Sequence, residues 1–94
     1  MLFSVFTLDN PDATDKRKAV HGDHVAHLKN AKAFGVTIAV GGPLVSDDGV
    51  TSIGSLMVLE APDRASAEKF NRADPFHRSG VWGKVEIRRF DRKE

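Results

Sequence analysis

The 94-residue sequence contains no cysteine, and this absence removes several kinds of chemistry at once. Without thiols the chain has no disulfide framework, no cysteine nucleophile and no thiolate metal site. A domain of this size must then be stabilised by its hydrophobic core alone or by a partner subunit. Oligomerisation is therefore an expectation from the outset.

Strong charge of one sign and long hydrophobic runs are also missing. The chain has 14 Lys and Arg residues against 13 Asp and Glu residues, and its formal net charge of +1 creates no field that would gather nucleic acid or an anionic membrane. No apolar run approaches the roughly 18 residues of a membrane span, and the N-terminus lacks the basic segment and the cleavage site of a signal peptide. We therefore expect a cytoplasmic protein without nucleic-acid or membrane partners.

The residues that are present are typical of one small globular domain. Charged residues make up 29% of the chain and hydrophobic residues 40%, and these values favour folding over disorder. A second hydrophobic core within 94 residues would leave neither half enough surface to bury. Residues 1–94 are therefore interpreted as a single domain.

Hydrophobic periodicity predicts six secondary-structure elements. In chain order they are a strand, a helix, two strands, a helix and a strand, at about residues 2–8, 14–34, 36–40, 53–59, 63–74 and 81–90. Gly35 is suited to end the first helix, Asp63 to cap the start of the second, and Pro75 to end it. An Asp-Gly pair at Asp48 and Gly49 predicts a hairpin between the two middle strands.

The order β-α-β-β-α-β in one small domain predicts a ferredoxin-like α+β fold, with a four-stranded antiparallel sheet and both helices on one face. The strand at residues 2–8 is apolar on both of its sides. The sheet face without helices would therefore expose a large apolar patch unless a second subunit covered it. We expect a homodimer packed face to face through the sheet, with higher oligomers left open.

Three histidines at spacings of three, His21, His24 and His27, raise the question of a metal site in the first helix. His21 and His27 are displaced by about 120° around the helix axis, so only neighbouring pairs can share an ion. No cysteine and no H-E-x-x-H spacing supplies further ligands. We therefore expect no metal and no other cofactor, with His21 and His27 partly exposed and His24 packed.

His24 lies close to the apolar stripe of the first helix, and Asp74 ends the second helix on the same side as Phe70. Two helices side by side on one sheet face can bring an imidazole and a carboxylate together in a cleft. Such a carboxylate positions the ring and supports its charged form, which provides a general acid or base. In the alternative interpretation Asp74 only caps the turn that begins at Pro75.

Other candidates carry weaker signals. The chain has no G-x-S-x-G segment, so a serine nucleophile has little support. Gly41 and Gly42 are not followed by a phosphate-binding or dinucleotide-binding pattern, and we interpret them as a bulge or close approach at the irregular end of a strand. Their backbone N–H groups remain available to a ligand.

Several short segments together resemble the YCII-related (YciI-like) family in their order and spacing. They are His24-Val25-Ala26-His27-Leu28, Gly35, Gly42-Pro43-Leu44, Asp47-Asp48-Gly49, Gly54-Ser55 and Ala73-Asp74-Pro75-Phe76. The resemblance implies a dimer of the dimeric α/β-barrel kind, with the family's histidine on His24 and its aspartate on Asp74. It also implies chemistry on small ring compounds such as dehydrochlorination, and related folds include muconolactone isomerases.

The sequence departs from that family before the histidine. Members often carry an arginine three or four residues upstream of it, where this chain has His21 and Val20. Arg17 and Lys18 lie further back along the helix. The departure leaves any anion-binding role of that arginine open in this chain.

Two functions fit these observations. In the first, the protein is a small enzyme of the proton-transfer lyase or isomerase type, in which His24 transfers the proton and Asp74 orients the ring. Its substrate is a compact anionic or aromatic metabolite, contacted by Gly42, Pro43, Ser55 and Phe76. In the second, the protein is a non-catalytic dimer that binds a small ligand or a partner, and the His24–Asp74 pair is only structural. An open pocket beside the pair would favour the first.

Overall fold

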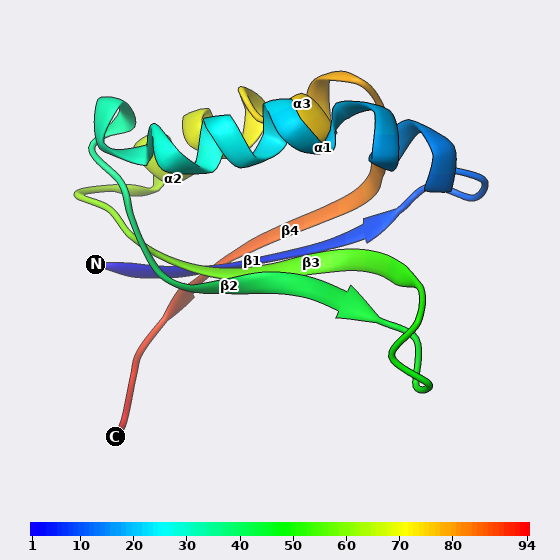
Figure 1. Cartoon of the computed structure of the whole chain (residues 1–94). Coiled ribbons are helices and arrows are strands. Elements are labelled where there is room, and N and C mark those ends of the chain that lie inside the picture. Colours follow the sequence, from blue (N-terminus) through cyan, green and yellow to red (C-terminus); the bar gives the residue numbers. More distant parts are fainter.

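The structure, a computed structural model, describes all of residues 1–94 (Figure 1). Its elements in chain order are β1 (Leu2–Asp9), α1 (Thr14–Lys29), the 3-10 helix η1 (Ala31–Phe34), β2 (Thr37–Val45), β3 (Ser52–Glu60), α2 (Arg64–Arg72), α3 (Pro75–Arg78) and β4 (Trp82–Phe90). No helix is both long and apolar enough to cross a bilayer.

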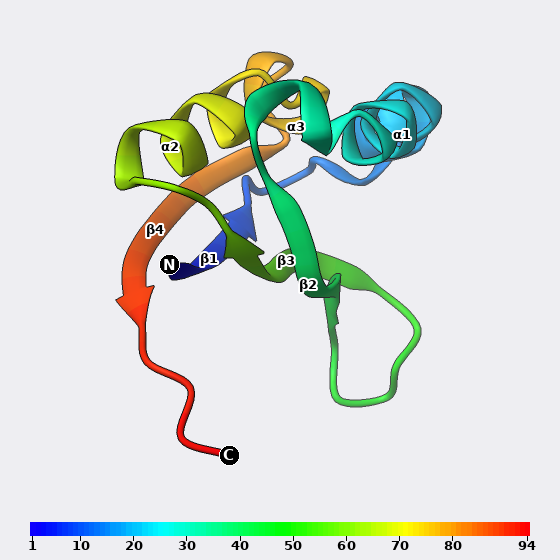
Figure 2. The ribbon, with the colours of Figure 1, turned by 90° about the vertical axis from the view of Figure 1, so that its left-hand side faces the viewer.

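The four strands form one antiparallel sheet in the order β2-β3-β1-β4, and every helix lies on the same face of it (Figures 1 and 2). The expected ferredoxin-like α+β arrangement is confirmed. It follows from the connections, because each helix joins a strand to one that is not its nearest neighbour in the sheet.

Residues of alternating burial along β1 fix which side of the sheet carries the core. Phe3, Val5 and Thr7 point towards the helices and are buried. Val5 is paired with Met57 on β3 and with Ile87 on β4, so one row of side chains crosses three strands under the helices. A shift of the register by one residue would turn this row to the other face, which fixes the pairing.

The first helix is shorter than the sequence predicts. α1 ends at Lys29, and the backbone at Asn30 (φ −97°, ψ 18°) leaves the α-helical region before η1 continues to Phe34. Gly35 then adopts a left-handed conformation with φ 72°, as a helix-ending glycine does. The helical segment therefore ends at Gly35 as predicted, but its last turn is a separate 3-10 helix.

β2 continues further than the sequence predicts, through Gly41, Gly42 and Pro43 to Val45. β2 is an edge strand, so a proline that lacks an N–H group is tolerated there. The register shifts lie between Ile38 and Val40 and between Leu44 and Val45, so the bulge expected at Gly41 and Gly42 is not there. Gly41 is instead a close approach, because a Cβ atom there would lie 3.0 Å from the Met57 side chain.

The second helix is divided at its end by another cap. α2 begins after Asp63, whose side chain accepts the Ser66 backbone N–H at 2.8 Å, as predicted. It ends at Arg72, two residues before the predicted end, because Asp74 adopts an extended conformation and starts the short helix α3 at Pro75. This cap places Asp74 at the junction of α2 and α3.

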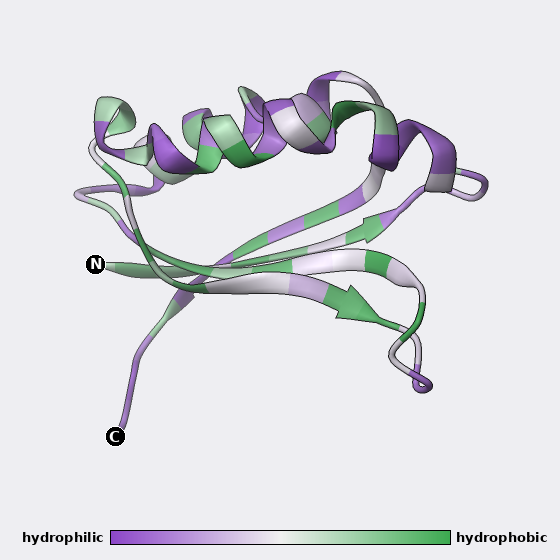
Figure 3. Ribbon diagram, viewed as in Figure 1, coloured by the Kyte–Doolittle hydropathy of each residue, from purple (hydrophilic) through white to green (hydrophobic).

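The face of the sheet opposite the helices has no covering element within the chain (Figures 1 and 2). Its strands carry hydrophobic segments (Figure 3), and Val40, Leu56 and Phe90 are exposed to 60%, 40% and 41%. We call this surface the open face. The single chain therefore covers β1 on one side only.

Candidate active site

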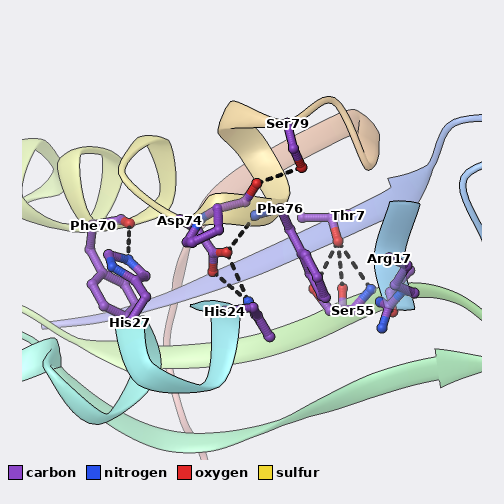
Figure 4. A network of polar contacts seen from close by, with 11 residues as sticks. Thr7, Arg17, His24, His27, Ser55, Phe70, Asp74, Phe76 and Ser79 are labelled. Atoms are coloured by element: carbon purple, nitrogen blue, oxygen red, sulfur yellow. Dashed lines mark hydrogen bonds and ion pairs between the residues drawn. The ribbon is translucent and has the colours of Figure 1, made fainter. Parts of the chain in front are cut away.

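His24 and Asp74 lie 50 residues apart in the sequence and meet under α3 (Figure 4). The Nδ1 atom of His24 lies 2.8 Å from Oδ1 and 2.9 Å from Oδ2 of the carboxylate. A carboxylate only accepts hydrogen bonds, so Nδ1 is the nitrogen that carries the hydrogen. The Nε2 atom has no hydrogen-bond partner within the protein.

The Asp74 side chain is only 1% exposed and also caps α3. Its Oδ1 atom accepts the Phe76 backbone N–H at 2.9 Å. A buried carboxylate requires such partners because its burial without them is strongly unfavourable. The cap fixes the carboxylate, and the carboxylate in turn fixes the plane and the hydrogen position of the imidazole.

Aromatic side chains hold the imidazole on its other sides. The rings of His24 and Phe76 stack with centroids 3.9 Å apart and planes inclined by 7°. The rings of Trp82 and His24 are nearly perpendicular, with centroids 6.2 Å apart and planes inclined by 86°. The Arg17 side chain lies beyond Phe76, with Cζ 4.7 Å from the ring centroid (Figure 4). These contacts leave the ring little freedom to turn.

Arg17 is itself held in place by two contacts. Its Nε donates to Oδ2 of Asp9 at 2.9 Å, and its Nη2 donates to the carbonyl oxygen of Gly54 at 2.8 Å. The side chains of this ion pair are mostly buried, at 12% and 9% exposure. Arg17 therefore links β1, β3 and α1 at the end of the site.

A cavity of about 730 Å³ opens between α1 and the β2–β3 hairpin. Its size lies within the range of small-molecule sites. His24, Gly42, Pro43 and Ser55 line it, whereas Asp74 and Phe76 lie outside its lining. The structure thus brings the histidine and three of the four expected substrate contacts to one cavity, with Phe76 buried behind the His24 ring.

The buried hydroxyl group of Thr7, on β1, holds Ser55 in place. The fully buried Thr7 accepts the Ser55 backbone N–H through Oγ1 at 3.0 Å, and the two hydroxyl oxygens lie 2.8 Å apart. This pair is formed across the register of β1 and β3. Ser55 is thereby fixed at the cavity wall.

The family model for the YCII-related domain matches residues 1–91. The chain belongs to this family. An uncharacterized protein of Haemophilus influenzae is 27% identical to this YCII-related domain over 94 residues, with 96% of each chain covered. The resemblance found in the sequence is therefore confirmed.

One solved structure connects this YCII-related domain with a named enzyme. It is the 5-chloro-2-hydroxyhydroquinone dehydrochlorinase TftG from Burkholderia phenoliruptrix, in complex with 2,5-dihydroxybenzoquinone. The TM-score is 0.87 and the sequence identity is 28%, over 99% of this chain and 96% of that one. The likeness therefore extends over the whole domain.

The other two histidines of α1 have different surroundings. His27 donates through Nε2 to the Phe70 carbonyl oxygen at 2.8 Å and stacks on the Phe70 ring, so it ties α1 to α2. His21 lines the cavity, with its ring centroid 6.4 Å from that of His24. No three His, Asp or Glu side chains of the YCII-related domain are gathered so that they could hold a metal ion.

Sequence reasoning gave no site role to several groups that line the cavity or support it, among them Arg17, Lys18, His21 and Thr7. Arg17 and His21 lie seven and three residues before His24, spacings that place all three on one side of a helix. This signal was available in the sequence. Thr7 had no such signal, because its partner Ser55 is defined only by strand pairing.

Proposed function

We propose that this YCII-related domain is a small-molecule enzyme of the proton-transfer lyase or isomerase type. The observation that carries the proposal is that the two nitrogen atoms of the His24 ring have different surroundings. Its Nδ1 is bound by Asp74, while Nε2 lacks a protein partner and the side chain borders the cavity. A ring held in this tautomer accepts a proton at Nε2.

In the proposed mechanism, Nε2 of His24 removes a proton from the substrate, and the electron pair of the broken bond moves into the substrate. In an elimination, a leaving group then departs with its own electron pair. In an isomerisation, the same proton returns to a different atom. Asp74 faces the imidazolium that forms and stabilises its charge. The similarity to TftG, whose name describes an elimination, supports this reaction class.

Substrate contacts in the proposal come from the strand side of the cavity. Gly42 and Pro43 provide a wall of edge strand without long side chains, and Ser55 provides a hydroxyl. Phe76 acts through His24 by stacking on it rather than by lining the cavity. The proposal also includes a homodimer formed through the open face, since that face is apolar and uncovered.

The test compares His24→Ala with His77→Ala, an exposed histidine on α3 outside the cavity. Chloride release from 5-chloro-2-hydroxyhydroquinone and the isomerisation of unsaturated lactones are measured for both variants. We expect His24→Ala to lower turnover by about 10² to 10⁴, the usual contribution of a general acid or base, and to keep the fold. Wild-type turnover in His24→Ala would refute the proposal.

A second candidate function is favoured by the role of Asp74 as the α3 cap. In a non-catalytic domain that binds a small ligand or a partner, the pair would be purely structural. His24→Ala would then lower stability and leave ligand affinity intact. Absence of wild-type turnover on all the chlorinated hydroquinones and lactones would support this candidate.

A further inference from the structure

The cavity beside His24 is bordered by basic groups and by no carboxylate. Its 16 lining residues include Arg17, Lys18, His21 and His24, but none of the 13 Asp and Glu residues of the chain. The nearly neutral chain therefore has a local excess of positive charge at this cavity. Such an excess raises the local concentration of anions.

The cavity is also polarised along its length. Lys18 and His21 lie on the N-terminal half of α1, while Val25 and Leu28 line the cavity further along the helix, with His24 between them. Ten residues of α-helix, from position 18 to 28, span about 15 Å. Along the axis of α1, the lining of the cavity therefore changes from basic side chains to apolar ones.

The strand wall follows the same direction. The N-terminal half of α1 lies above the hairpin end of β2 and β3, and its C-terminal half lies above the start of β2 (Figure 1). Thr51 and Ser52 line the cavity at the hairpin end, together with Val50, and Ile38 lines it at the start of β2. The two hydroxyl groups therefore lie towards the basic end, and an apolar side chain closes the other end.

Lys18 is the cation of this cavity that the protein leaves without a partner. The Arg17 guanidinium is engaged by Asp9 and by the Gly54 carbonyl oxygen, which places a negative charge beside it. The Lys18 ammonium has no ion pair among those of the chain. An incoming anion therefore meets an uncompensated charge at Lys18.

Ser55 adds a hydroxyl group to the cavity wall. Its Oγ lies 2.8 Å from Thr7 Oγ1, which accepts the Ser55 backbone N–H and lies 3.4 Å from the Ser55 carbonyl oxygen. A serine hydroxyl can donate and accept hydrogen bonds, so it offers a fixed polar contact to a ligand.

We propose that the cavity selects a compact, polarised anion, and that Lys18 is the residue that selects its charge. The acidic oxygen of a carboxylate or an ionised ring hydroxyl lies at the Lys18 end, and the apolar body lies against Leu28 and Ile38. His24 Nε2 then faces the middle of the ligand. This placement of the reacting atom rests on the proposed function, whereas the charge selection concerns binding alone.

The test uses two probes of similar shape and different charge. They are benzoic acid, which is ionised at neutral pH and carries its charge at one end of an apolar ring, and its uncharged analogue benzamide. Binding to the wild type, Lys18→Gln and Lys18→Glu is measured by calorimetry at neutral pH and at two salt concentrations. Lys29→Gln is the matched control, because Lys29 lies on the same helix outside the cavity.

We expect the wild type to prefer the acidic probe. Lys18→Gln should weaken binding of the acidic probe about two- to fivefold, as the loss of one exposed charge pair does, and Lys18→Glu should weaken its binding more. The affinity of the uncharged probe should be the same for all variants, and Lys29→Gln should bind the acidic probe as the wild type does. Added salt should weaken binding of the acidic probe to the wild type more than its binding to Lys18→Gln.

Three results would overturn the inference: equal wild-type affinity for both probes, no binding of the acidic probe, or undiminished binding of it to Lys18→Glu. Measurements on His24→Ala separate this inference from the proposed function. If Lys18 selects the anion while His24→Ala retains turnover, only the proposed function fails. If His24→Ala loses turnover while Lys18→Glu binds the acidic probe normally, only the charge selection fails.

Discussion

The carboxylate of Asp74 accepts hydrogen bonds from two different groups, the Phe76 backbone and the His24 ring. The two interpretations that the sequence left open, a helix cap and a partner of the histidine, therefore describe the same side chain. The cap makes the carboxylate rigid, and a rigid carboxylate orients a ring better than a mobile one. A substitution that keeps the cap and changes the partner can separate these contributions.

Asp74→Asn is such a substitution. Asparagine is a good N-cap, so its oxygen can still accept the Phe76 N–H, but its amide group places a donor against the Nδ1–H of His24. The ring must then change its tautomer or turn. We expect turnover to fall by about 10² to 10⁴ and the melting temperature to change little, measured by initial rates and by thermal unfolding. A large loss of stability with normal turnover would instead show a purely structural pair.

At the scale of elements, two aspartates decide where the helices above the sheet begin. Asp63 starts α2 and Asp74 starts α3, whereas α1 begins without a side-chain cap. The division of the helical segment 64–78 into two parts positions Asp74 against the His24 ring. The shared packing of His27 and Phe70 then holds α1 beside α2.

The Asp63 cap predicts a dependence of stability on pH. The backbone N–H and the hydroxyl of Ser66 lower the pKa of the Asp63 carboxyl below its ordinary value of 3.8. A carboxyl with a lower pKa in the folded state stabilises the fold above its unfolded pKa, and this contribution is lost as the pH falls through the folded pKa. The wild type should therefore lose stability below about pH 4 through this group.

Asp63→Asn keeps an acceptor at the cap and removes the titration. Its melting temperature should fall less steeply below about pH 4 than that of the wild type, in scans from neutral to acidic pH. Asp23→Asn, at an exposed position of α1, is the matched control and should follow the wild type. Parallel curves for Asp63→Asn and the wild type would contradict the role assigned to the cap.

At the scale of the whole molecule, the sheet separates the side that carries the His24–Asp74 pair from the open face. The helices, the His24–Asp74 pair and the cavity lie on one side (Figures 1 and 4). The open face carries apolar side chains with substantial exposure, among them Val40, Leu56 and Phe90. Exposed apolar patches of this kind commonly mark contacts between proteins.

The proposed dimer can be tested at Leu56, which is 40% exposed on the open face. The wild type should scatter light at micromolar concentration with twice the chain mass of 10.3 kDa. Leu56→Glu should shift it to the mass of one chain, because a charge on each copy would be buried against the other. Ala19→Glu, on an exposed position of α1, should remain a dimer. A wild-type monomer, or a dimeric Leu56→Glu variant, would count against this interface.

The pairing of His24 with Asp74 was one of two interpretations that the residues left open, and the resemblance to the family favoured it. The sequence by itself determined the fold class, the number of strands and the caps at Gly35 and Asp63. These features depend on local periodicity, on turn and cap chemistry, and on helical phase, all of which are written along the chain. The boundaries were less well predicted at Asn30, Gly41 and Arg72. The extension of β2 past Gly41 was decided by its position at the sheet edge, and the end of α2 at Arg72 by the Asp74 cap.

The tertiary structure alone decided the cavity and its charge. Thr7 supports Ser55 only because β1 and β3 pair in one register, and Arg17 is neutralised only because Asp9 and Gly54 lie beside it. Phe76 is placed behind His24 rather than in the cavity by the short helix α3. Such contacts join residues far apart in the sequence, so no local pattern determines which side chains face the same hollow.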